Sequence, residues 1–200
     1  MRKGVFIVFE GIDGSGKSSC MAGVASELEK DHNVAVTAEP TKSEIGMLIR
    51  SSPDVTAEAE ALLFAADRAQ HTQQIKEWME DGRIVLCDRY YASTLAYQSA
   101  NLNGRSADIR WLTDIHTGVI IRPDLTLLFD IDPEIGLERI APRGEVSKFE
   151  RLEYLKEVRK NYLVIAEKDR FKVMDASRTK EEVLVETMKH ISETVSRKSK

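Results

Sequence analysis

Near its N-terminus the chain reads Gly11-Ile12-Asp13-Gly14-Ser15-Gly16-Lys17-Ser18. A glycine followed after four residues by Gly-Lys-Ser is the phosphate-binding loop pattern. It stands between the apolar run Val5–Phe9, which predicts a strand, and Ser19–Lys30, which predicts a helix. Glycines reach φ > 0, so successive backbone N–H groups can point at one anion, and the helix N-terminus adds positive charge. The loop therefore predicts nucleoside triphosphate binding, with Lys17 on the β- and γ-phosphates and the Ser18 hydroxyl on Mg²⁺.

The bulk properties of the chain exclude several other classes. A length of 200 residues predicts one domain, with room for a small insertion. The net charge of −4 gives no support for nucleic-acid binding. Because no apolar run approaches the ~18 residues of a membrane span, we expect no membrane segment, and we expect no signal peptide before the first strand. Cys20 and Cys87 lack metal-site spacing and predict buried thiols in a reducing compartment, the cytoplasm.

Strand and helix patterns alternate along the whole chain. Further strands are expected at Asn33–Ala38, Arg83–Asp88, Leu125–Ile131 and Phe171–Asp175. Helices are expected at Thr56–Asp81 and Ser106–Thr117, and after the capping boxes Ser147–Glu150 and Thr179–Glu182. Such alternation predicts an α/β fold with a parallel sheet covered by helices on both faces.

A second motif begins where the apolar strand Arg83–Cys87 ends. Asp88 at this strand end can hold Mg²⁺ beside the phosphate loop. Since ligands of open α/β sheets bind at the carboxyl ends of the strands, we expect Arg89 to point into the same cleft and bridge two phosphates. The alternative is a surface ion pair between Asp88 and Arg89.

Two further segments carry candidate residues. Phe64, Arg68 and His71 share one helix face, where an aromatic ring and an arginine could hold a base; core packing of Phe64 is the alternative, and we interpret His71 as structural. Pro142 and Gly144 interrupt a helical pattern that carries cations on both sides, Arg139, Arg143 and Lys148. This segment, about residues 138–150, predicts a lid over phosphates, or otherwise a charged surface turn.

Together these motifs resemble the thymidylate kinase family, whose members phosphorylate dTMP with ATP. The resemblance runs over almost the whole chain, and its most specific parts are Phe9–Ser19, Glu39-Pro40-Thr41 with Ile45-Gly46 and Arg50, Leu63–Arg68, and Asp88-Arg89-Tyr90 with Ser93 and Ala96-Tyr97-Gln98. It implies a single domain over 1–200, a five-stranded parallel sheet in the order 2-3-1-4-5 and a small mobile lid. It also implies ATP and dTMP as substrates, Mg²⁺ as cofactor, and a homodimer formed through helices such as Thr56–Asp81.

The resemblance also implies residue roles. The loop residues expected to hold ATP are Gly11, Ile12, Asp13, Gly14, Ser15, Gly16, Lys17, Ser18 and Ser19, with Ser18 and Asp88 on the metal. In the dTMP pocket, Phe64 should stack on thymine, and Arg68 with Ser93 or Gln98 should contact its edge. Tyr97 should crowd the ribose 2′ position, and Arg50 and Arg89 should hold the phosphate. Asp13 should contact the 3′-hydroxyl or the metal, Glu39 is a further substrate-binding candidate, and Asp175–Ser177 should pass near adenine.

One position of the loop bears on catalysis. Some family members carry an arginine where this chain has Gly14, so the resemblance implies that the lid supplies the transition-state cation here, from Arg139 or Arg143. The expected catalytic set is therefore Lys17, Arg89, Asp13 and these two lid arginines.

Two other functions are compatible with the same motifs. One is a kinase for another nucleoside monophosphate or for a nucleoside. The other is a nucleotide-dependent switch or binding module, which would need no second nucleotide pocket.

Overall fold

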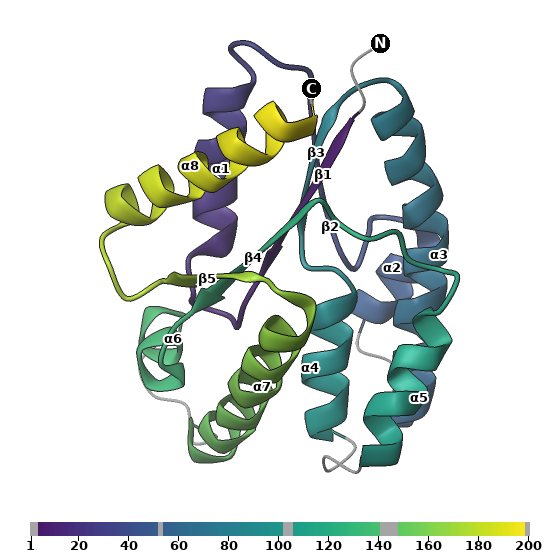
Figure 1. Cartoon of the computed structure of the whole chain (residues 1–200). Helices are drawn as coiled ribbons and strands as arrows, with labels where there is room; N and C mark the ends of the chain where they lie inside the picture. Colours follow the sequence, from purple (N-terminus) through teal and green to yellow (C-terminus); the bar gives the residue numbers. More distant parts are fainter. Residues whose placement is uncertain (1–3, 52–53, 102–105, 141–147, 199–200) are drawn as a thin grey trace.

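The computed structural model describes residues 4–51, 54–101, 106–140 and 148–198 (Figure 1). Its sheet contains β1 (Val5–Glu10), β2 (Val34–Ala38), β3 (Ile84–Asp88), β4 (Leu125–Asp130) and β5 (Lys172–Asp175). All neighbouring strands are parallel, in the order β2-β3-β1-β4-β5, which confirms the predicted topology.

Helices cover this sheet on both sides (Figure 1). They are α1 (Lys17–Leu28), α2 (Glu44–Arg50), α3 (Ala57–Glu80), α4 (Tyr91–Asn101), α5 (Ser106–His116), α6 (Pro133–Ile140), α7 (Lys148–Asp169) and α8 (Lys180–Lys198). On one side α1 and α8 pack against each other. On the other side α3 packs on β1 and β3, and α4, α5 and α7 extend this layer by packing on one another.

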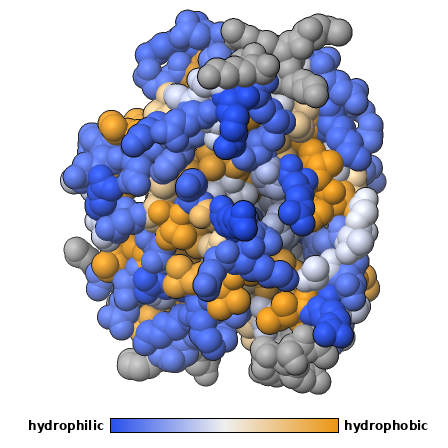
Figure 2. Space-filling model, in the orientation of Figure 1, coloured by the Kyte–Doolittle hydropathy of each residue, from blue (hydrophilic) through white to orange (hydrophobic). Residues whose placement is uncertain are grey.

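Alternating side chains of β1 explain the two-sided core. Phe6 and Val8 pack in a cluster with Ile75 of α3, whereas Ile7 and Phe9 pack with residues of α1. Because both faces are covered, every residue of β1 is buried, which is why Val5–Phe9 form a continuous apolar run before Glu10. Figure 2 shows that hydrophilic residues dominate the surface in this view, with small hydrophobic patches between them.

Helix ends mostly follow the predicted signals. The Thr56 side chain caps α3 by accepting from Ala59 N, and Thr179 and Glu182 form the expected reciprocal capping box before α8. The sequence did not single out α2 or α4. The first is too short for a periodic pattern, and the second is buried on most of its sides, so it has no apolar stripe. Ser147 lies outside the described residues.

The parallel sheet brings the ends of its strands to one edge. Phe9 of β1 lies opposite Asp88 of β3, and Asp130 of β4 lies opposite Asp175 of β5. The segments after these strands therefore gather at this carboxyl edge, where the candidate residues lie. Among the described residues, no helix is both long enough and apolar enough to cross a membrane.

Candidate active site

The phosphate loop connects β1 to α1. Gly16 is the N-cap of α1, with a φ of 82°, and no side chain caps the helix. A Cβ atom at Gly16 would meet no described atom within 4 Å, so this part of the loop faces open space. The first turn of α1 therefore presents backbone N–H groups and a positive helix end to an anion.

A tight contact between two glycines places α6 on the loop. Gly14 has a φ of +80°, and a Cβ atom there would collide with the backbone oxygen of Gly136 in α6. One turn further along α6, Arg139 donates from Nη1 to the carbonyls of Gly14 (3.3 Å) and Ala176 (3.1 Å). A side chain at position 14 is thus excluded, while an arginine of α6 already lies against the loop and the segment after β5.

Lys17, Ser18 and Asp88 come together at the head of α1. Burial and the positive charge of Arg89 lower the pKa of Lys17, whose Nζ lies 3.9 Å from Asp88 Oδ1. The Ser18 hydroxyl donates to the other carboxylate oxygen, Oδ2. Asp88 Oδ1 is buried and accepts no hydrogen bond from another described residue. A hydroxyl and an under-coordinated carboxylate are ligands that suit Mg²⁺.

Protein groups alone do not make a metal cage here. Within the described ranges, no group of three or more His, Cys, Asp or Glu side chains could hold a metal ion. A cation at Ser18 and Asp88 would take its other ligands from phosphate oxygens and water, which is the usual Mg²⁺ arrangement.

Arg89 links the loop to α4. Its backbone is left-handed, with a φ of 69°, and its N–H donates to Phe9 O at 2.9 Å. Such a backbone costs roughly 1–2 kcal/mol for a residue with a Cβ atom. The side chain donates from Nη2 to Asp13 Oδ1 at 2.6 Å and from Nη1 to Ser93 Oγ at 3.3 Å, and its guanidinium lies 5.1 Å from the Tyr97 ring centre. Three other predicted site residues, Asp13, Ser93 and Tyr97, therefore contact this one arginine.

Glu10, the last residue of β1, holds the start of α4 in place. Its buried carboxylate accepts from Tyr90 N (2.9 Å), Ser93 Oγ (2.6 Å) and Tyr162 OH (3.0 Å), and burial raises its pKa. Sequence reasoning missed Glu10 and Tyr162. An acid that ends an otherwise apolar strand was the available signal for Glu10, whereas the contact of Tyr162 from α7 depends on tertiary packing.

Arg68 lies at the centre of a buried network between α3, α4 and α5. Its Nε donates to Glu39 Oε2 at 2.8 Å, and its Nη2 donates to Thr94 Oγ1 at 3.0 Å and to Tyr90 O at 3.2 Å. Its Nη1 hydrogen-bonds His116 Nε2. Arg68 is 1% exposed, so this network lies inside the folded protein.

Two histidines complete this network. His71 hydrogen-bonds Glu39 Oε1 through Nδ1 (2.9 Å) and Thr37 through Nε2 (2.7 Å). His116 lies 2.6 Å from Leu112 O through Nδ1, and burial together with the charge of Arg68 lowers its pKa to about 4. A neutral His116 donates from Nδ1 and accepts from Arg68 at Nε2. No sequence pattern indicated a role for His116, because its contact with Arg68 joins two helices.

Some predicted residues lie apart from these groups. Gln98 is buried and donates to Glu60 of α3 at 2.9 Å. Arg50 is exposed and donates to the carbonyls of Pro40 and Thr41. Phe64 is half-buried on α3, one turn before Arg68.

The remaining candidates lie in the loop and the lid. Ile12 and Ser15 are buried, and Ser19 is exposed at the start of α1. Arg143 and the rest of 141–147 fall outside the described residues.

Comparison with known proteins agrees with this geometry. A family model for thymidylate kinase matches residues 9–187. A protein named "Probable thymidylate kinase" from Methanosarcina barkeri is 44% identical over 207 residues, covering 98% of this chain and 99% of its own. Proteins of the same name from Methanosarcina mazei and Archaeoglobus fulgidus are 40% and 42% identical, covering 98% and 94% of each chain. The chain therefore belongs to the thymidylate kinase family.

Proposed function

We infer that this protein transfers the γ-phosphoryl group of ATP to dTMP, giving dTDP and ADP. One observation carries the inference beyond family membership: Arg89 contacts Asp13 of the phosphate loop and Ser93 and Tyr97 of α4. Its guanidinium thus joins a triphosphate-binding loop to a wall of aromatic and polar side chains, as an enzyme that brings two phosphates together requires.

The donor nucleotide would bind over the loop and α1. Backbone N–H groups of Gly11–Ser19 would hold its phosphates, and Lys17 would neutralise the β- and γ-phosphates. The buried setting of Lys17 strengthens this interaction, because little water screens it. The segment Asp175–Ser177 would pass near adenine.

Mg²⁺ would be held by Ser18 directly and by Asp88, directly or through water. The bound ion neutralises developing charge on the phosphate oxygens. The contact between Ser18 and Asp88 keeps both groups pointing at this position.

The acceptor dTMP would bind between α3 and α4. Phe64 would stack on thymine, and Arg68 would contact the base edge, together with Ser93 or Gln98. Arg50 and Arg89 would hold the phosphate, with Glu39 fixing Arg68. Tyr97 would exclude a 2′-hydroxyl, and Asp13, which is half exposed, would contact the 3′-hydroxyl or the metal.

The chemistry asks for charge neutralisation rather than a strong base. The attacking oxygen of dTMP is already anionic, so Lys17, Arg89 and a lid arginine would act by positioning and electrostatic stabilisation. Arg139 is the described lid arginine that already contacts the loop. We propose a lid at about 138–150 within one domain spanning 1–200.

The assembly we propose is a homodimer in the cytoplasm. Helices α2 and α3 pack against each other and carry exposed large apolar side chains: Met47, Leu48 and Leu62 are 57%, 47% and 51% exposed. Burial of these side chains against a second copy would remove them from water.

A substrate panel tests the reaction. ADP release is measured with dTMP, dUMP, dCMP and dGMP at equal concentrations, using matched Mg·ATP. We expect the highest kcat/KM with dTMP, and a reduction of about 10–200-fold for dUMP, which lacks one methyl group. A preference for dCMP or dGMP would indicate another monophosphate kinase, and absence of transfer to every monophosphate would indicate a nucleotide switch or binding module.

A further inference from the structure

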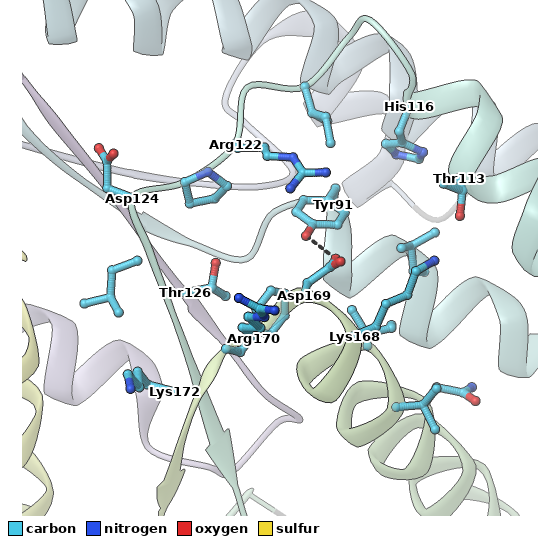
Figure 3. A pocket seen from close by; sticks show the side chains of 18 of the residues that line it. Tyr91, Thr113, His116, Arg122, Asp124, Thr126, Lys168, Asp169, Arg170 and Lys172 are labelled. Carbon is cyan, nitrogen blue, oxygen red and sulfur yellow. Dashed lines mark hydrogen bonds between the residues drawn. The ribbon is translucent and has the colours of Figure 1, made fainter.

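A cavity of about 770 Å³ lies away from the proposed active site (Figure 3). Its lining includes Leu125 and Lys172, the first residues of β4 and β5, together with parts of α4, α5, α7 and α8. The phosphate loop follows the last residue of β1 in the same parallel sheet, so the cavity and the loop lie at opposite edges. Its volume falls within the range of small-molecule sites.

The lining carries an excess of positive charge. Its cations are Arg122, Lys168, Arg170, Lys172 and Arg197, and its carboxylates are Asp124, Asp169 and Glu193. The carboxylates are engaged: Asp124 pairs with Lys198 at 2.7 Å, Asp169 accepts from Tyr91 OH at 2.7 Å, and Glu193 lies 3.9 Å from His190. All five cationic residues are exposed, and none of their side chains forms a hydrogen bond or ion pair with another described residue. This cluster belongs to a chain whose net charge is −4.

Helix ends explain only part of this cluster. Lys168 and Arg197 lie in the last turns of α7 and α8, where the helix dipole favours cations without any ligand. Arg122 belongs to the connection before β4, and Lys172 belongs to β5. Cations from a loop, a strand and two helix ends therefore line one cavity.

The backbone at Arg170 adds a second observation. Its φ is 58°, in the left-handed region, immediately after the end of α7. Glycine or asparagine is usual at such a position. Because Phe171 N donates to Ala166 O at 2.9 Å, Arg170 ends α7 with a left-handed C-cap, which places Arg170 in the lining of the cavity. Figure 3 shows Arg122, Lys168 and Arg170 arranged around the hydrogen-bonded pair Tyr91 and Asp169.

The rest of the lining suits an organic group. Apolar side chains line part of the cavity, among them Leu95, Ile109, Ile120, Ile165 and Phe171, and Thr113 and Thr126 also belong to the lining. A pocket with cations beside apolar surface matches a molecule that carries a phosphate chain on a flat organic group.

We propose that this cavity is a second binding site, separate from the active site, for a polyphosphate chain such as that of a nucleoside triphosphate. Arg122, Arg170 and Lys172 hold the phosphates, and the apolar wall contacts the organic group. The site does not depend on which monophosphate the active site accepts.

Calorimetric titration tests the proposal. The full chain, without Mg²⁺ and saturated with ADP and dTMP, is titrated with dTTP and, separately, with inorganic tripolyphosphate. The double variant Arg122→Glu/Lys172→Glu is compared with Lys156→Glu/Lys160→Glu, which makes the same charge change on exposed residues of α7 outside the cavity. We expect one further equivalent to bind the wild type and the control, and binding at least about 10-fold weaker in the cavity variant.

The arms separate the possible sources of binding. If dTTP binds more tightly than tripolyphosphate, the apolar wall contributes to binding. If the two bind equally, the phosphate chain alone accounts for the affinity. If the titrated dTTP or tripolyphosphate instead displaced ADP or dTMP from the active site, both double variants would show this binding to the same extent. The proposal is overturned if no further equivalent binds the wild type, or if the two double variants weaken binding to the same extent.

Discussion

The phosphate end and the base end of the proposed cleft are built in opposite ways. At the phosphate end, Lys17 and Asp88 lie 3.9 Å apart, and Asp13 is half exposed beside Arg89. At the base end, Arg68 and Glu39 are 1% and 5% exposed and lie 2.6 Å apart. Charges of the first kind can exchange partners with an incoming phosphate, whereas those of the second kind are part of the folded core. Substitutions at the phosphate end should therefore lower activity without lowering stability, whereas substitutions at the base end should lower both.

The largest expected effect is on turnover at the phosphate end. Lys17→Ala should lower kcat on the order of 10³-fold or more, because the developing charge on the phosphates loses its cation. The protein should stay folded, since Lys17 is a desolvated cation and its removal also relieves that penalty. ADP release and thermal melting measure the two effects. A variant with wild-type kcat would remove the loop lysine from the mechanism.

The next largest loss of turnover is expected when the lid arginines are replaced. If the lid supplies the transition-state cation, either Arg139→Ala or Arg143→Ala should lower kcat by about 10³-fold. Gly14 cannot be replaced by a compensating arginine, because α6 occupies the space of its side chain. Arg178→Ala, which removes a surface ion pair with Glu186, is the control. Near-normal kcat in both lid variants would contradict a lid cation.

The two ends also differ in how far the sequence predicted them. The loop and Asp88-Arg89 follow strand ends directly, so local spacing predicted that they lie at the carboxyl ends of the strands, whereas the strand order was implied by the family resemblance. The base end depends on contacts between distant elements. The sequence placed Arg68 on the right helix face but gave no sign of its burial or of His116. Likewise the structural role of the Glu10 carboxylate depends on the packing of the start of α4 and of α7, which donate hydrogen bonds to it.

At the base end, Glu39→Gln should destabilise the protein by about 3 kcal/mol. The variant leaves the Arg68 guanidinium buried without its counter-charge. Urea denaturation measures the loss. Glu153→Gln, which removes an exposed pair with Lys156, should cost less than about 1 kcal/mol. Equal costs in the two variants would show that the base end is no more structural than the surface.

The smallest expected effect is a dependence of stability on pH that comes from His116. Its pKa is about 4 in the folded protein and about 6.5 when unfolded. Between these values the unfolded chain binds the additional proton, so stability should fall as the pH falls from about 6.5 to about 4, by at most about 3 kcal/mol. Glu10 acts in the opposite direction: its raised pKa removes stability as the pH rises above its ordinary value near 4.5.

His116→Gln isolates the histidine from such other groups. A glutamine amide can accept from Arg68 and donate to Leu112 O, but it does not titrate. Urea denaturation of both proteins from pH 7.5 to 4.5 gives a difference in unfolding free energy at each pH. We expect this difference to shift in favour of the variant as the pH falls below about 6.5, because only the wild type must keep a neutral imidazole beside a buried guanidinium. A constant difference across this range would mean that the Arg68 network tolerates a charged His116, and the base end would then be as adaptable as the phosphate end.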